Sequence, residues 1–296
     1  MPYAWHAHPD VWVLIAVLLG GYFWSLRHLG RRQTAPGQAA ATRLQKVCWV
    51  TGVLTVWVAS DWPVHDLSER FLYSVHMTQH MLITLVAPPL LLLGTPAWLA
   101  RELLQPAALY KVVRRLARPF PALLLFNALI VVTHWPAFVD ATLHSELLHF
   151  ATHAALFISA LLMWAPVTAP LPELRPLTPP AQMLYLFLQS IVPTVPASFL
   201  VFADRPIYRF YEHVPRLWSL SAGEDQRIAG LLMKLGGGLL LWMVIAVLFF
   251  KWHAAEEEND RQARHWRDLE REIDGASPGG PGVSPGSEQT MRWTGS

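Results

Sequence analysis

The chain has 296 residues, of which 53% are apolar and only 15% are charged, and its mean hydropathy is +0.30. An average soluble domain carries about 25% charged residues, so these values exclude a disordered chain, a nucleic-acid binder and an ordinary soluble enzyme. The net charge of +2 is uninformative as a total, but the placement of the charges is not. The single cysteine, Cys48, excludes an internal disulfide framework and a CxxC metal or redox pair.

Apolar stretches that can cross a bilayer recur along the chain; each crossing takes roughly 20 mostly apolar residues. The first ten residues, MPYAWHAHPD, lack the basic segment with which a cleaved signal peptide begins. We therefore expect an all-α polytopic membrane protein with seven transmembrane helices. The predicted spans cover residues 11–29, 46–60, 71–93, 120–135, 144–164, 181–202 and 228–250.

Proline pairs lie inside two of these spans. Pro88 and Pro89 fall in the third span, and Pro193 and Pro196 fall in the sixth. Because proline removes a backbone donor and kinks a helix, we expect both spans to bend and to help open a polar cavity.

Two segments outside the spans differ in character from them. Residues 96–117 interleave apolar side chains with arginine and lysine, which suits a helix lying in the membrane interface. Residues 256–274 are charged and can be helical, whereas residues 275–296 are rich in Gly, Ser and Pro, which predicts disorder. The chain should thus comprise a membrane domain of residues 1–252 and a partly disordered cytoplasmic tail of residues 253–296.

Lysine and arginine are distributed unequally among the predicted loops. The loops at 27–46 and 101–118 are rich in both, whereas Arg70 stands alone between the second and third spans and no basic residue lies at 136–143. The loop near 204–227 breaks the pattern with several arginines. Since basic loops stay on the cytoplasmic side, the sum predicts an outside amino terminus and a cytoplasmic carboxyl terminus.

With this orientation, most of the thirteen histidines fall on the outer side. The third span reads FLYSVHMTQHML, so His76 and His80 share one helix face, and Met77 and Met81 repeat the spacing on the adjoining face. The fifth span reads HSELLHFATHAALF and carries a second pair, His149 and His153. Both pairs reach a depth of roughly 13 Å below the outer ends of their spans. If the helices are neighbours, four imidazoles meet at one level.

Two histidine pairs at one level can chelate a metal ion. Imidazole with thioether nearby suits copper, because soft methionine ligands favour Cu(I). His134 lies at the outer end of the fourth span, on the same side of the membrane as the two pairs, and is a further candidate ligand. Glu146, three residues before His149, and Asp61, at the end of the second span, can each hold a ligating imidazole in the right tautomer.

Each of these residues also has a plainer explanation. A single histidine in a span tethers helices by hydrogen bonds, and Met77 and Met81 alone would fill the core. The histidines at positions 6, 8, 65 and 213 fit solvated loops. Lys234, inside the last span, can snorkel outward or pair with an acid such as Asp225. It is the combination of two pairs in one leaflet that favours a metal or haem site.

Four segments carry a resemblance to a known family. They are FLYSVHMTQHMLITLVAPPLLLLGTP (71–96), THWPAFVD with the following HSELLHFATH (133–153), VFADRPIYRFY (201–211) and EDQRIAGLLMKLGGG (224–238). In them the chain resembles, from about residue 10 to 252, the seven-span CtaG-type cytochrome c oxidase assembly factors of bacteria. The resemblance implies a non-enzymatic accessory protein of the bacterial cytoplasmic membrane, with oxidase subunits and the lipid bilayer as partners and no nucleic acid.

The resemblance also implies copper as the cofactor, supplied to a haem-copper oxidase. It carries over onto candidate metal ligands and onto two supporting residues at the start of the last span. Lys234 departs from the pattern, where an apolar or aromatic residue is expected, and puts the packing of the last span in question. The candidate ligands are His76, Met77, His80, Met81, His134, His149 and His153, and the supporting residues are Asp225 and Gln226.

Two other functions would use the same histidines. A membrane b-type cytochrome would take axial haem ligands from the third and fifth spans, although histidines one turn apart, about 6 Å, would crowd a pair of haems. A copper transporter would need polar groups that continue to the cytoplasmic face, and the inner halves of the spans are nearly all apolar.

Overall fold

The computed structural model describes residues 6–33, 38–208 and 210–276, and every regular element in these ranges is a helix. The chain divides into two compact units, Met1–Phe249 and Phe250–Ser296, and helix α16 (Gly237–Ala276) contains the boundary. Residues 256–274, expected to be able to form a helix, lie within α16. Of the segment expected to be disordered, residues 275–296, the first two residues belong to α16 instead, and residues 277–296 lie outside the described ranges.

Six helical runs of the described chain are long and apolar enough to cross a membrane. A seventh, α9 (Pro119–Thr133), passes the same test only together with α8 (Ala107–Leu116), from which it is bent by 79°. The predicted all-α polytopic membrane fold is therefore confirmed, with six to seven candidate spans. The six runs are α1 (Pro9–His28), α3 (Arg43–Ser60) with α4 (Val64–Arg70), α5 (Tyr73–Met81) with the π-helical turn η1 (Leu82–Val86) and α6 (Ala87–Gly94), α11 (Glu146–Thr168), α12 (Pro179–Ile191) with α13 (Thr194–Phe202), and α15 (Ala222–Leu231) with the π-helical turn η3 (Leu232–Gly236) and α16.

The prolines shape both spans in which they lie. In the sixth span, the helix is interrupted between α12 and α13 at Val192 and Pro193. In the third, Pro88 has no N–H to donate to the Thr84 carbonyl four residues back, and η1 covers this stretch. The indole Nε1 of Trp164 on α11 donates to that carbonyl instead, at 3.0 Å. The freed backbone group thus ties the third span to the fifth.

The segment at 96–117, expected to form one interfacial helix, is divided into α7 (Ala97–Leu103) and α8. Pro106 accounts for the break, because it lacks an N–H and disfavours a helical conformation at Gln105. No residue of α8 is buried, and Arg114 and Arg115 lie in its last turn. If α9 crosses the bilayer, the 79° bend places α8 close to the membrane plane.

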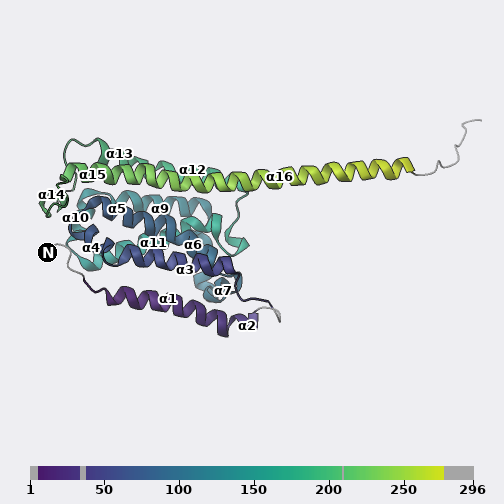
Figure 1. Cartoon of the computed structure of the whole chain (residues 1–296), viewed down its shortest axis with the longest axis horizontal. Helices are drawn as coiled ribbons and strands as arrows, with labels where there is room; N and C mark the ends of the chain where they lie inside the picture. Colours follow the sequence, from purple (N-terminus) through teal and green to yellow (C-terminus); the bar gives the residue numbers. More distant parts are fainter. Residues whose placement is uncertain (1–5, 34–37, 209, 277–296) are drawn as a thin grey trace, which may run out of the picture. The chain divides into compact units, whose positions relative to one another are not determined.

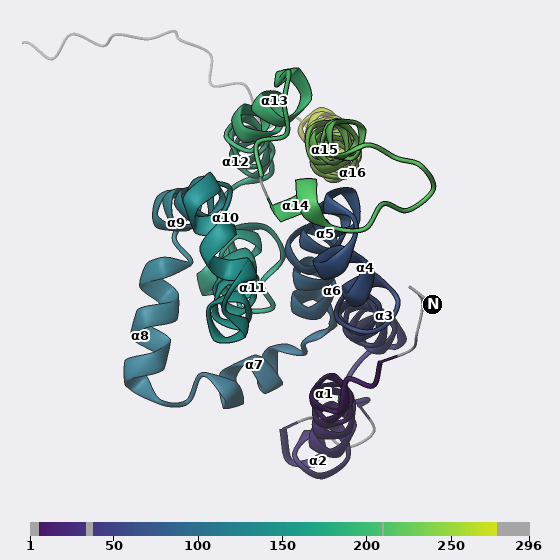
Figure 2. The same ribbon diagram turned by 90° about the vertical axis from the view of Figure 1, so that its left-hand side faces the viewer.

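Within the first unit, the short helices segregate to two ends (Figures 1 and 2). Helices α4, α10 (Pro136–Leu143) and α14 (Phe210–His213) lie at the end where α5, α11 and α15 begin, which we name the histidine end. Helices α2 (Gly30–Gln33) and α7 lie at the opposite end, which we name the basic end. The predicted orientation would put the basic end in the cytoplasm and stays a prediction.

The core of the first unit lies between α9, α11, α12 and α16. Phe126, Leu156, Trp164 and Leu186 are buried there together. On the outward faces of the helices, large apolar side chains such as Val13, Phe199 and Leu239 are exposed, as expected of surfaces that face lipid.

Candidate metal centre

Three imidazoles converge beneath the histidine end. Helix α5 carries His76 and His80 one turn apart, and α11 carries His153. Each histidine offers one ring nitrogen as a ligand, and these three nitrogens lie within 4.8 Å of one another. The ring centroids are 4.5 Å apart for His76 and His80, 4.8 Å for His80 and His153, and 5.9 Å for His76 and His153. The structure thus makes the third and fifth spans neighbours, and we name these residues the triad.

The triad has ring nitrogens without hydrogen-bond partners. Nδ1 of His76, both nitrogens of His80 and Nε2 of His153 are buried and, within the described ranges, unpaired. A buried polar atom without a partner typically costs about 1–3 kcal/mol, and native proteins tolerate few of them. A cation coordinated by these lone pairs would remove that cost, so the donor set fits a metal ion.

His149 lies beside the triad and turns toward a carboxylate. Its ring stacks on His153 with centroids 4.4 Å apart, while its Nε2 lies 2.9 Å from Oε1 of Glu69. Glu69, on α4, also lies 3.2 Å from Nε2 of His65. Glu69 was not among the sequence candidates. The signal that could have found it is the i,i+4 spacing of His65 and Glu69 in HDLSE.

The two carboxylates expected to orient an imidazole lie elsewhere. Glu146 is the exposed first residue of α11, and no ion pair or hydrogen bond joins its carboxylate to a described histidine. Asp61 accepts hydrogen bonds from Nε1 of Trp12 at 2.9 Å and of Trp57 at 2.6 Å, and from the backbone N–H of Trp62. Asp61 therefore ties α1 to α3, and Glu69 occupies the position beside the histidines that Glu146 was expected to take.

His134 approaches the triad from the end of α9. Its Nδ1 donates to the Ile130 carbonyl at 2.7 Å, while its buried Nε2 has no partner in the described ranges. Its ring centroid is 6.3 Å from that of His80. The hydroxyl of Tyr208 donates to the His134 carbonyl at 2.9 Å. Burial raises the pKa of Tyr208 to about 12, so this hydroxyl stays protonated at neutral pH.

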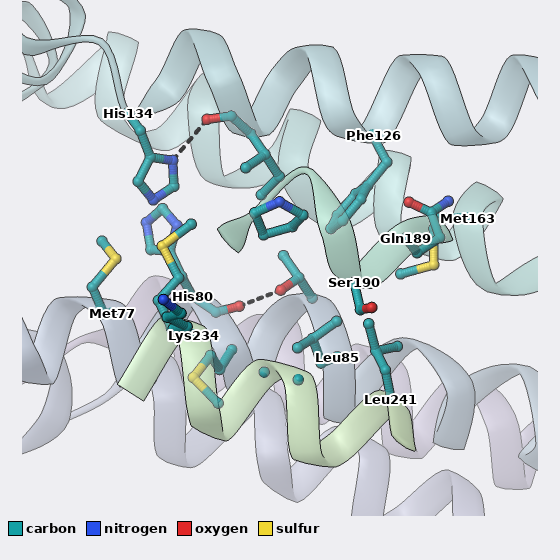
Figure 3. A pocket seen from close by; sticks show the side chains of 17 residues that line it. Met77, His80, Leu85, Phe126, His134, Met163, Gln189, Ser190, Lys234 and Leu241 are labelled. Carbon is teal, nitrogen blue, oxygen red and sulfur yellow. Dashed lines mark hydrogen bonds between the residues drawn. The ribbon is translucent and has the colours of Figure 1, made fainter. Parts of the chain in front are cut away.

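Two small cavities adjoin the histidines. One, of about 60 Å³, is lined by His80, His134, Met77, Met81 and further residues (Figure 3). The other, of about 20 Å³, is lined by His76, His80, His149, His153 and Met77, among others. The smaller one has room for a water or a single ion.

The two methionines of the third span do not occupy equivalent places. Met77 is buried and lines both cavities. Met81 lines only the larger one and packs toward the last span, where a Cβ built on Gly236 would lie 2.9 Å from its Cε. Met77 is therefore the thioether nearer to the triad's own cavity.

Asp225 and Gln226, the two supporting residues expected at the start of the last span, contact different parts of the chain. Asp225, which is 1% exposed, accepts the backbone N–H of Tyr73 at 2.7 Å and of Ser74 at 3.1 Å. It thereby caps the amino terminus of α5, whose next turn carries His76. Gln226 accepts the N–H of Ile207 at 2.6 Å and donates to the Leu200 carbonyl at 3.1 Å.

The sequence left open whether Lys234 extends outward or pairs with an acid. Lys234 lies on η3 and lines the larger cavity (Figure 3). Its Nζ donates to Oγ of Ser198 at 3.3 Å and lies 5.7 Å from the ring centroid of Phe202. No carboxylate of the described chain lies within ion-pair distance of it, and the side chain of Asp225 is engaged with α5.

The comparisons with known proteins agree with the resemblance drawn from the motifs. The family model of the cytochrome c oxidase caa3 assembly factor (Caa3_CtaG) matches residues 20–255. The chain therefore belongs to this family. No curated protein and no solved structure gives a significant match.

Proposed function

We propose that this member of the caa3 oxidase assembly factor family binds a copper ion at His76, His80 and His153 and supplies it to the oxidase. Membership of the family makes it an assembly factor for cytochrome c oxidase. The finer proposal is that it acts as a copper carrier without catalytic chemistry of its own. The observation that carries it is the half-buried triad, with four buried ring nitrogens that have no partner in the described ranges.

The donor set favours copper in its monovalent state. The triad contains imidazoles and no carboxylate, so its neutral form has no negative charge to balance a buried divalent ion. The Met77 thioether in the same cavity adds a soft donor, and soft donors favour Cu(I). His134, whose Nε2 has no partner among the described residues and whose ring centroid is 6.3 Å from that of His80, offers a further imidazole.

The sizes of the cavities weigh against haem. Pockets for cofactors and drug-sized ligands measure roughly 300–1,000 Å³, whereas the two cavities beside the histidines measure about 20 and 60 Å³. A macrocycle placed between α5 and α11 would have to separate rings whose centroids are 4.8 Å apart. A single ion needs no such separation.

Deeper polar groups give little support to a transport path. At the wall of the larger cavity, Gln189 accepts from Asn127 at 2.7 Å and donates to the hydroxyl of Tyr185 at 3.0 Å. These amide and phenol groups bond to one another and are poor ligands for Cu(I). These groups therefore do not continue a path of copper ligands from the triad toward the basic end. We infer instead that copper is delivered to the oxidase from the histidine end.

Metal analysis of the purified full chain tests the proposal. We expect the wild type to bind one copper ion and His76→Ala/His80→Ala to lose it. His28→Ala/His144→Ala is the matched control, because both of its histidines are exposed and bond to backbone carbonyls of their own helices or loops. Equal copper in the wild type and the triad variant would refute the site.

Cells lacking the protein should make the oxidase polypeptides but assemble little active enzyme. Added copper should restore part of the activity if delivery is the missing step. Oxidase activity is compared in the deletion strain, the His76→Ala/His80→Ala strain and the wild type at limiting copper. Full activity in the double mutant would indicate a copper-independent assembly scaffold instead.

A further inference from the structure

We propose that a second group of side chains at the histidine end forms a copper-loading site, where the ion binds before it reaches the triad. This inference rests on the proposed copper function. The group comprises Glu69 with His65 and His149, and it continues through His8 to Asp66. None of these side chains except His149 was a candidate ligand in the sequence, and Nε2 of His149 faces Glu69 while its ring stacks on His153.

Glu69 is the centre of the group. Its Oε1 lies 3.2 Å from Nε2 of His65 and 2.9 Å from Nε2 of His149. One carboxylate oxygen therefore joins imidazoles from α4 and α11, which are 76 residues or more apart along the chain. Carboxylate and imidazole together form a donor set used by many metal sites. A neutral imidazole that binds the ion through Nε2 carries its ring proton on Nδ1, so no proton needs to leave when the ion binds between Nε2 and Glu69.

The group is partly open to the surroundings. The side chain of Glu69 is 34% exposed, that of His65 is 25% exposed and that of His149 is 14% exposed. Beside this group, Nε2 of His8 lies 3.2 Å from Oδ2 of Asp66, and the His8 ring centroid is 5.0 Å from that of His65. Glu69 is the more exposed of the two carboxylates, and its charge attracts cations, whereas Asp66 lies 3.7 Å from Nε of Arg70.

The histidines form a continuous series from this group to the triad. Successive ring centroids are 5.0 Å apart from His8 to His65, 6.4 Å from His65 to His149, and 4.4 Å from His149 to His153. An ion moving along the series can keep at least one imidazole ligand at every step. Its oxidation state does not change, and the donors change from mixed oxygen and nitrogen to nitrogen alone.

A purely orienting role for Glu69 fits the contacts less well. A carboxylate that orients a ligand bonds to that ligand's second nitrogen, yet Glu69 contacts His65 and His149 and, within the described ranges, hydrogen-bonds to no member of the triad. The unpartnered nitrogens of His76 and His80 also show that the triad is not held by a carboxylate. The group at Glu69 is therefore a separate site, and His149, which stacks on His153, connects it to the triad.

The test measures the rate and the extent of copper binding separately. Full-length protein in detergent receives Cu(I) from its bicinchoninate complex without oxygen, and the loss of the complex's colour is followed in time. Glu69→Gln keeps the size of the side chain but removes its charge. Because charge beside a binding site raises the on-rate of a cation by about 10–10³, we expect loading to slow about tenfold or more, with the final copper content unchanged. Glu146→Gln, an exposed carboxylate at the same end, should load at the wild-type rate.

A second variant guards against a folding defect in the first. His65→Asn leaves Glu69 in place and removes one of its two imidazole partners, so the same slowing at unchanged final copper content is expected. Wild-type loading rates in both variants would overturn the loading site and leave the triad intact. A loss of final copper content in Glu69→Gln would assign Glu69 to the triad's affinity and would also overturn it. Absence of copper from the wild type would refute the proposed function, and the loading site with it.

Discussion

The cap that the last span places on α5 gives a prediction with a calculable size. Asp225 accepts the backbone N–H groups of Tyr73 and Ser74 through two different carboxylate oxygens. These N–H groups belong to the first turn of α5, where a helix has no backbone acceptors of its own. Removing the carboxylate in Asp225→Ala therefore leaves two donors unpaired at a buried position.

Each hydrogen bond to a charged group is worth about 1.5–3 kcal/mol, so Asp225→Ala should lower the free energy of unfolding by about 3–6 kcal/mol. Asp225→Asn keeps one acceptor oxygen, and its loss should be about half as large. Since His76 lies in the turn that follows, loosening α5 should also weaken copper binding, in the order wild type, Asn, Ala. The neighbouring variant Glu224→Gln should change neither quantity appreciably, because Glu224 is exposed and glutamine keeps an acceptor for the Ser221 capping box.

Unfolding by sodium dodecyl sulfate in mixed micelles, followed by circular dichroism, measures the stability of each variant. Copper content is then measured under conditions in which all the variants are folded. If Asp225→Ala unfolds within about 1 kcal/mol of the wild type, the carboxylate does not hold α5 and the reasoning fails. If stability falls but copper binding does not, the cap supports the fold without positioning His76.

Two further predictions concern packing and orientation. Gly94→Ala should destabilise the chain by about 1–3 kcal/mol, because the added Cβ would lie 2.7 Å from the backbone Cα of Trp49. Gly20→Ala, whose Cβ would meet open space, is the control in the same unfolding assay. Equal stabilities of the two variants would contradict the close approach of α3 and α6. Reporter fusions after residues 35, 66, 110 and 252 should report inside, outside, inside and inside, and an outside report at residue 252 would disprove the odd number of spans.

Much of this architecture is written in local sequence patterns. Apolar stretches long enough to cross a bilayer predict the spans, since backbone groups in lipid must bond within a helix. The i,i+4 spacing places His76 above His80 and His149 above His153, because 3.6 residues complete a helical turn. Pro193 marks the break in the sixth span, and Pro106 divides the interfacial segment for the same chemical reason. The family motifs identify the assembly factor family without any structure.

Which side chains meet across helices depended on how the helices are rotated against one another, and the spacing within one helix does not contain that information. The neighbourhood of α5 and α11 brought His153 to His76 and His80, while Nε2 of the adjacent His149 meets Glu69 of another helix. Glu146 shares a helix with His149 yet points outward, whereas Glu69 arrives from another helix. Asp225 reaches the amino terminus of α5 from the other end of the sequence, because only tertiary packing brings the first turn of the last span beside the third.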